Sequence, residues 1–124
     1  MTREGKTFPR FALKVDATFD FYHTHIYFTP TQVELAQRFR ETLSKQKYFR
    51  VSPLVDHPIG PHPLPMFEAD FKGAHLHEAL KFLAAERGEL SVLVHPLSGN
   101  EILDHTTYAW FLGLKQNLLL DIFK

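Results

Sequence analysis

Histidine is unusually frequent in this 124-residue chain, which has eight, and two of them form a His-x-His pair at His23 and His25. Residues two apart on a β-strand point to the same face of the sheet, so these imidazoles lie side by side if the segment is a strand. Two adjacent imidazoles can share one metal ion. For this pair alone, the alternative is two hydrogen-bonded sheet histidines without an ion.

Two further histidines follow or precede segments with a strand pattern. His95 ends an apolar segment and falls on the same side as Leu93. His62 lies between Pro61 and Pro63, and because proline fixes the backbone φ angle, this histidine has little entropy to lose on binding a ligand. For His95 the alternative is a loop histidine at the end of a strand. For His62 it is an exposed histidine on a rigid turn.

Three other polar residues are candidates for the same chemistry. Glu68 points away from the neighbouring phenylalanines, toward the side of the histidines, where it can complete a two-histidine-one-carboxylate site or act as a base. Tyr27 shares the strand face of His23 and His25. His105 follows Asp104, the expected N-cap of a short helix, and can support the site or act as a base, with a structural role as the equal alternative.

The remaining histidines have weaker patterns. His75 and His77 are two apart on an expected helix, which separates them by about 200° around the helix axis, so they cannot bind one ion together. We expect both to be solvated. His57 precedes a proline in a loop, and its pattern predicts no role.

Hydrophobic periodicity and turn signals predict the elements that must position these residues. We expect strands at about 19–28, 48–55, 66–71 and 90–95, helices at about 29–45 and 73–86, a short helix at about 104–112, and an apolar tail at 118–123. The first helix can begin with a capping box of Thr29 and Gln32, or one register later with Thr31 and Glu34. Residues 1–18 are expected to form an arm outside a single domain at 19–124.

The order βαββαβ predicts an α+β, ferredoxin-like fold with a four-stranded antiparallel sheet and two helices on one face. In that topology the first strand is central and has the third and fourth strands as neighbours. The other face of the sheet is expected to be open to a ligand or to a second subunit. We therefore expect a homodimer.

Composition excludes several classes of function. Fourteen basic and fourteen acidic residues balance, so the sequence has no electrostatic signature of a nucleic-acid or membrane partner. With no cysteine, thiolate metal sites and cysteine nucleophiles are excluded. The segment from Met1 to Lys14 lacks the apolar core of a secretory signal, and no apolar run approaches the roughly 20 residues of a membrane helix. We expect a cytoplasmic protein with a small-molecule partner.

Several separated motifs resemble the DOPA 4,5-dioxygenase family. They are Tyr-His-Thr-His-Ile-Tyr-Phe at 22–28, Pro-Ile-Gly-Pro-His-Pro at 58–63 running into Met-Phe-Glu at 66–68, Val-Leu-Val-His-Pro at 92–96, Gly99, and Asp-His-Thr at 104–106. The similarity extends from about Phe19 to the C-terminus. It implies a ferredoxin-like fold and cleavage of the ring of a catechol, such as L-DOPA, with molecular oxygen.

Extradiol ring cleavage needs a metal with open positions for the catechol and O2, and imidazoles can hold Fe(II) in that way. We expect His25, His62 and His95 to form the metal core, with His23 as a fourth ligand or as the base. Glu68, Tyr27 and His105 are expected nearby. Zinc is a possible occupant of the purified protein, because nitrogen ligands accept it readily.

Two other functions fit the same residues. One is a metal-binding ferredoxin-like module with a structural or regulatory site and no turnover. The other is a cofactor-independent dimeric α/β-barrel oxygenase or a simple small-molecule binder, in which the histidines hold no metal.

Overall fold

The structure is a computed structural model, and it describes residues 19–123. The predicted arm at 1–18 lies outside the described residues. Among the described residues, no helix combines the length and the apolar character needed to cross a membrane.

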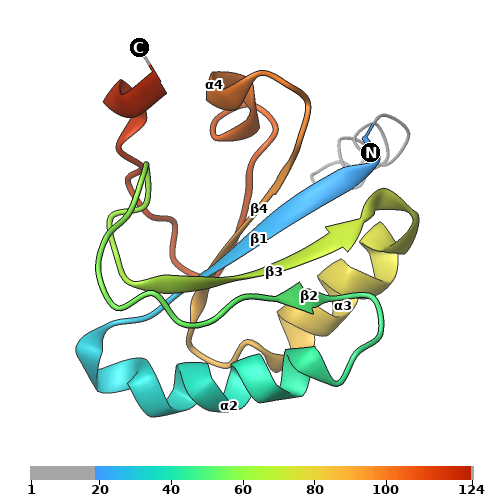
Figure 1. Ribbon diagram of the computed structural model, residues 1–124, viewed down its shortest axis with the longest axis vertical. Coiled ribbons are helices and arrows are strands. Elements are labelled where there is room, and N and C mark those ends of the chain that lie inside the picture. Colours follow the sequence, from blue (N-terminus) through green and yellow to red (C-terminus); the bar gives the residue numbers. More distant parts are fainter. Residues whose placement is uncertain (1–18, 124) are drawn as a thin grey trace.

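Five strands form one antiparallel sheet, with β1 at its centre (Figure 1). The order across the sheet is β2-β3-β1-β4-β5, and the strands are β1 Phe21–Tyr27, β2 Arg50–Val51, β3 Met66–Lys72, β4 Ser91–Pro96 and β5 Trp110–Leu112. The α+β, ferredoxin-like prediction is confirmed, and β1 has β3 and β4 as its neighbours, as expected. The fifth strand is an addition to the predicted four.

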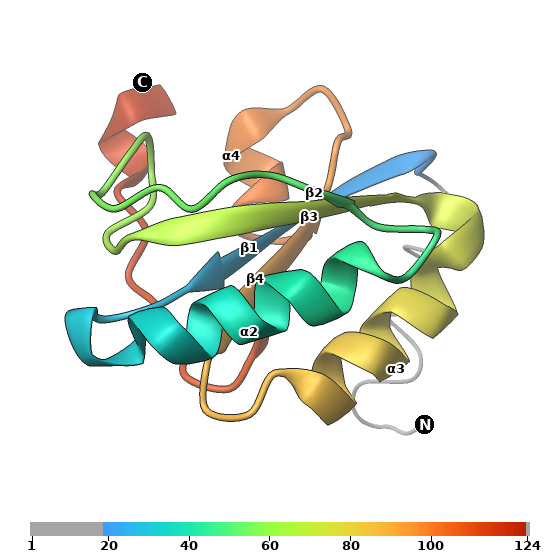
Figure 2. The ribbon, with the colours of Figure 1, turned by 60° about the horizontal axis from the view of Figure 1, so that its bottom comes forward.

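Two helices, α2 at Val33–Ser44 and α3 at Leu76–Glu86, cover one face of the sheet (Figure 2). Short 3-10 turns precede them, η1 at Pro30–Gln32 and η2 at Gly73–His75. The predicted capping box is present, because the backbone N–H of Thr29 donates to the side-chain oxygen of Gln32 at 3.0 Å.

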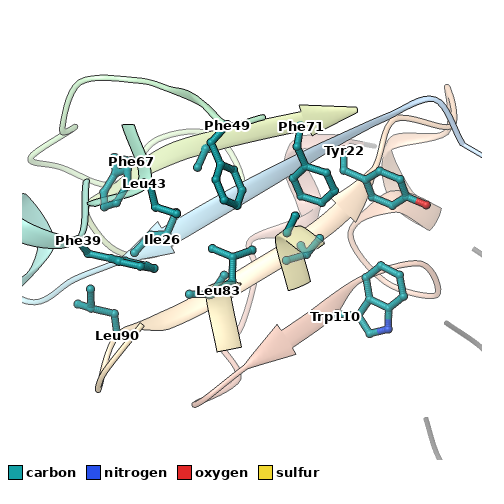
Figure 3. Close-up of a cluster of buried hydrophobic side chains, with 14 of the residues drawn as sticks. Tyr22, Ile26, Phe39, Leu43, Phe49, Phe67, Phe71, Leu83, Leu90 and Trp110 are labelled. Atoms are coloured by element: carbon teal, nitrogen blue, oxygen red, sulfur yellow. The ribbon is translucent and has the colours of Figure 1, made fainter. Parts of the chain in front are cut away.

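The main hydrophobic core lies between these helices and the sheet (Figure 3). Alternate residues of β1 supply Tyr22 and Ile26, and β3 supplies Phe67 and Phe71, as the alternation of each strand predicts. The rings of Tyr22 and Phe71 stack with centroids 5.3 Å apart. Apolar burial of this kind is the main contribution to the stability of the fold.

The strand predicted at 48–55 is much shorter in the structure. Only Arg50–Val51 is a strand, and Val55 adds an isolated bridge to Met66. Pro53 lies between these two pairings. Because proline has no N–H to donate, it interrupts an edge strand of this kind.

The helix predicted at 104–112 is wrong. A single turn, α4 at Glu101–Asp104, is followed by turns and then by β5. Asp104 is therefore the last residue of a helix and not its N-cap. Asn100 caps this turn instead, since its side chain accepts the N–H of Leu103 at 2.9 Å.

The strand β5 forms because the outer edge of β4 is free to pair. Val94 pairs with Trp110 and Val92 with Leu112. This register directs the side chains of Trp110 and Leu112 to the helix-covered face. The Trp110 ring lies 6.3 Å from that of Tyr22, centroid to centroid (Figure 3). Pairing with a distant strand thus overrides the local helical pattern.

The second face of the sheet, which we expected to be open, is covered. The proline-rich loop at 56–65 and α4 lie over this face, together with the C-terminal tail that ends in η3, Leu120–Phe123 (Figures 1 and 2). The backbone N–H of Leu119 donates to the carbonyl of Pro61 at 2.8 Å, which joins tail and loop. The expected homodimer stays a prediction, but it loses the open sheet face as its reason.

Candidate metal centre

Three histidines of the second face come from the two central strands. His23 and His25 lie two apart on β1, and His95 on β4 is the direct partner of His23 in the strand register. One side-chain nitrogen from each of the three lies within 4.8 Å of the others. The His-x-His pair and the strand-ending histidine therefore meet, as their spacing predicts.

The tightest contact of the centre joins Nε2 of His25 and Nε2 of His95, which are 3.1 Å apart. Nδ1 of His95 lies 2.8 Å from the carbonyl oxygen of Pro96, so Nδ1 carries the ring proton and donates it. Nε2 of a neutral His95 then has a lone pair, which is directed at His25. A ring N–H that donates to a backbone carbonyl is also how proteins orient histidines that bind metals.

These two nitrogens fit a shared ion. Metal–nitrogen bonds are about 2.0–2.1 Å for zinc, so an ion bound to both nitrogens fits their 3.1 Å separation. Nδ1 of His25 is buried without a hydrogen-bond partner within the described part of the chain. Neutral imidazole donors of this kind suit Fe(II) and Zn²⁺.

His62 reaches the centre from the proline-rich loop, but it stands outside the group of three. Its ring lies 4.0 Å from that of His25, centroid to centroid, and its Nδ1 is 2.7 Å from the hydroxyl of Tyr27. Burial raises the pKa of Tyr27, so the phenol keeps its proton. His62 is the hydroxyl's one hydrogen-bond partner among the described residues, which favours the phenol as donor and places the proton of His62 on Nε2.

His105 also joins the cluster, because the short α4 directs it back over the sheet. Its ring lies 4.3 Å from that of His95 and 4.8 Å from that of Phe123 in the tail, centroid to centroid. Nδ1 of His105 lies 2.7 Å from the carbonyl oxygen of Glu101 and donates a hydrogen bond to it. Nε2 of a neutral His105 is consequently an acceptor, as it is in His95.

A second group surrounds His23 at the edge of the centre. Its Nδ1 lies 3.5 Å from a carboxylate oxygen of Glu68, and its Nε2 lies 3.7 Å from one of Asp70. Single ligand atoms from the three residues lie within 4.8 Å of one another. Burial, and then the neighbouring Glu68, raise the pKa of Asp70 to about 7. Glu68 thus contacts the centre through His23. It does not form a group of possible metal ligands with His25 and His95.

Burial sets the charge of the imidazoles at the centre. It holds the pKa of His25 well below its usual value, with further contributions from the nearby His62 and His95. It lowers the pKa of His62 to about 4 and that of His95 to about 3, where the hydrogen bond to Pro96 opposes the shift. All three are neutral at pH 7, which is the protonation state that binds metals.

The other described histidines lie away from the centre. His57 is exposed and pairs with Asp56 at 2.9 Å. His75 stacks on Tyr48 at 5.4 Å, centroid to centroid, and His77 is exposed on α3, so neither contributes to the cluster. His77 is solvated, as expected, whereas His75 lies in η2 and is half-buried against Tyr48.

Asp104, expected from the sequence only as an N-cap, is a buried carboxylate whose role in the site was missed. It accepts hydrogen bonds from the backbone N–H of Ser98, at 3.1 Å, and from its hydroxyl, at 2.5 Å. These bonds fix the turn after β4 against α4 and so position His105. A polar Ser98-Gly99-Asn100 turn followed by an acidic residue was the signal available in the sequence.

Comparison with known proteins gives three matches that cover most of the chain. Residues 22–122 match the model of the Dopa 4,5-dioxygenase family. The DOPA 4,5-dioxygenase of Amanita muscaria is 30% identical over 80% of this chain, and the match spans 47% of that enzyme's length. An uncharacterized 21.2 kDa protein of Botryotinia fuckeliana is 29% identical over 98% of this chain and 73% of its own.

A solved structure is similar as well. The crystal structure of a "putative dioxygenase" from Nostoc punctiforme has a TM-score of 0.82 and 29% identity, covering 89% of this chain and 94% of its own.

Proposed function

The chain belongs to the Dopa 4,5-dioxygenase family, and from this premise we propose that it is a metal-dependent dioxygenase that opens the ring of a catechol such as L-DOPA with O2. The observation that carries the proposal is the contact at 3.1 Å between Nε2 of His25 and Nε2 of His95. Two buried, neutral imidazoles face each other here, and Nε2 of His25 donates to Nε2 of His95 the proton that a metal ion bound to both nitrogens would replace.

We assign the metal to His25, His95 and His23, the three histidines whose nitrogens lie within 4.8 Å of one another. Fe(II) is the expected ion, and Zn²⁺ is a possible occupant of the purified protein. When bound, Fe(II) supplies redox chemistry and open coordination positions for a catechol and O2. Glu68, beside Nδ1 of His23, holds that ring in its orientation.

The remaining polar residues handle protons. Nε2 of His105 is an acceptor, since Nδ1 donates to Glu101, and we assign it as the base that takes a catechol proton. His62 carries a proton on Nε2, kept there by the hydroxyl of Tyr27 on the opposite nitrogen. From Nε2 it can donate a hydrogen bond to an oxygen of the substrate. His62, expected as a ligand from the sequence, becomes a hydrogen-bond donor to the substrate in this proposal.

The cover over the second face has a chemical use in such an enzyme. Phe123 and the loop at 56–65 lie over the cluster, so His25, His62, His95 and His105 are each at most 7% exposed. Exclusion of water strengthens the electrostatic interactions at the centre and protects reactive species from hydrolysis.

The same burial favours the second candidate, a structural or regulatory metal site. Structural sites are closed, whereas catalytic sites keep a position open for substrate. In this reading the ion holds the loop, α4 and the tail on the sheet, and no catechol is consumed.

One experiment separates these two functions. Purified protein is loaded with Fe(II) without oxygen, mixed with each member of a catechol panel that includes L-DOPA, and then exposed to air. We expect a yellow ring-opened product together with uptake of about one O2 per catechol. Stoichiometric metal without product or oxygen uptake across the panel would favour the structural site.

A further inference from the structure

The metal centre is accessible from one side. The side chain of His23 is 32% exposed, whereas the other four histidines of the cluster are at most 7% exposed. Asp70, 3.7 Å from Nε2 of His23, is half-buried at the same point. Within the described part of the chain, a small molecule therefore reaches the cluster past His23 and Asp70.

A cavity of about 440 Å³ adjoins this side, and its walls include both His23 and Asp70. A volume of this size falls in the range of small-molecule sites, roughly 300–1,000 Å³. Phe21 and Leu97, both apolar and exposed, form part of the lining. An aromatic compound can thus contact apolar surface here while one edge of its ring faces His23.

Three cations, Lys47, Arg50 and Lys72, line the same cavity. Arg50 is the register partner of Asp70 on β3, which places it on the face of the sheet that carries His23. Within residues 19–123, none of these cations lies within 4.0 Å of a carboxylate oxygen in an ion pair. Asp70 is the one carboxylate among the described lining residues, and it faces His23.

We propose that this cavity selects catechols with an anionic side chain, whose carboxylate binds Arg50 and the flanking lysines. The catechol part of this inference rests on the proposed function. A guanidinium can bind a carboxylate through two parallel hydrogen bonds, and the excess of positive charge repels an amine. A carboxylate without an amine is therefore preferred over a cationic side chain, because three cations face a single carboxylate, Asp70, among the described lining residues.

A second cavity, of about 700 Å³, adjoins His105 between the tail and the turn after α4. Its described lining includes His105 and a single cation, Lys115. His105 contributes little exposed surface to it, because its ring packs on Phe123. Lys115 is therefore the matched control. Like Arg50, it is a cation that lines a cavity beside the cluster, but His23 is not part of that cavity's lining.

Binding without turnover tests the proposal. Zinc-loaded protein is titrated by calorimetry with 3-(3,4-dihydroxyphenyl)propionate, with dopamine and with 3-phenylpropionate. We expect the acidic catechol to bind roughly tenfold or more tightly than dopamine, with the difference shrinking as salt is raised. Arg50→Met should abolish this preference, Arg50→Lys should restore part of it, and Lys115→Met should leave it unchanged.

The outcomes distinguish this proposal from the proposed function. Binding of 3-phenylpropionate that depends on Arg50 supports the anion site even if no catechol is ever opened. Equal binding of dopamine and the acidic catechol overturns it, even if both are turned over by the iron-loaded enzyme. A preference that Lys115→Met removes and Arg50→Met retains also overturns it, because the second cavity is then the site.

Discussion

Different elements cover the two faces of the central strand β1, and the two faces carry different side chains. Tyr22 and Ile26 point to the face covered by α2 and α3, where apolar side chains pack closely. His23, His25 and Tyr27 point to the face covered by a loop, α4 and the tail, where five imidazoles gather. One strand thus serves a hydrophobic core and a polar centre with alternate residues.

The two faces contribute differently to stability. Burial of an apolar side chain stabilises the fold by about 1.5–3 kcal/mol. Burial of imidazoles gains less, because each polar nitrogen needs a partner, and Nδ1 of His25 has none among the described residues. The helix-covered face therefore contributes most of the stability, and we propose that the histidine face serves metal binding instead. Substitutions on the two faces should therefore affect different measurements.

The largest effect is expected from His25→Ala. Loss of a metal ligand at the middle of the cluster should lower the rate of oxygen uptake with a catechol at least about a thousandfold, since loss of an outer partner of a ligand alone typically reduces affinity or activity 10–100-fold. Folding of the metal-free protein should hardly change. His57→Ala, on the exposed loop, is the control and should keep the full rate. Activity of His25→Ala within threefold of the parent would disprove the assignment.

The complementary change on the other face is Phe67→Ala. Phe67 is fully buried against the helices, with its ring 6.4 Å from that of Phe39, centroid to centroid. Truncation should lower the free energy of unfolding by about 3–5 kcal/mol. Urea denaturation measures this, and the fraction that stays folded should still bind metal. A loss below 1 kcal/mol would show that the helix-covered face is not the main source of stability.

A smaller effect is expected from Tyr27→Phe, which removes the hydroxyl beside Nδ1 of His62. Without this donor the proton of His62 is no longer held on Nε2, so turnover should fall roughly tenfold, while metal content stays at the parent level. Tyr108→Phe, near Phe19 and away from the cluster, is the control. Loss of metal in Tyr27→Phe would instead indicate that His62 is a ligand.

The smallest effect is the pH dependence of the metal-free protein. The pKa values of His25, His62 and His95 are lowered in the folded state, so the unfolded chain binds more protons below about pH 6.5. Stability should therefore fall as the pH drops from 7 toward 4. The raised pKa of Asp70 acts in the opposite direction but concerns one group. Denaturation at several pH values measures the slope, and a flat or reversed slope would contradict the neutral imidazole cluster.

Much of the fold and part of the centre follow from alternation and periodicity. The pairing of His23 and His25 on one face, and of His95 beside them, required only a period of two and a central first strand. The two prolines around His62 predict a preorganised residue, and its ring does lie 4.0 Å from that of His25, centroid to centroid, although the prolines could not show that Tyr27 would orient it. These features are local, or depend on pairings that the ferredoxin-like order fixes.

The cover over the centre could not be predicted because its causes are not local. Trp110 joins the sheet since β4 offers an unpaired edge, and the tail is joined to the proline-rich loop by the hydrogen bond from Leu119 to Pro61 and packs on the cluster through Phe123. His105 enters the cluster only because α4 ends at Asp104, which Ser98 anchors. The alternation of Trp110, Phe111 and Leu112 was a strand signal, but a helix accommodates the same three residues.

Metal titration of the histidine face tests the central claim most directly. Metal-free protein, His25→Ala, His95→Ala and His57→Ala are titrated with Fe(II) without oxygen, and bound metal is counted per chain. The parent and His57→Ala should each bind one ion, whereas His25→Ala and His95→Ala should bind at least about 100-fold more weakly. Equal binding by all four proteins, or no binding by the folded parent, would contradict a metal centre formed by these histidines.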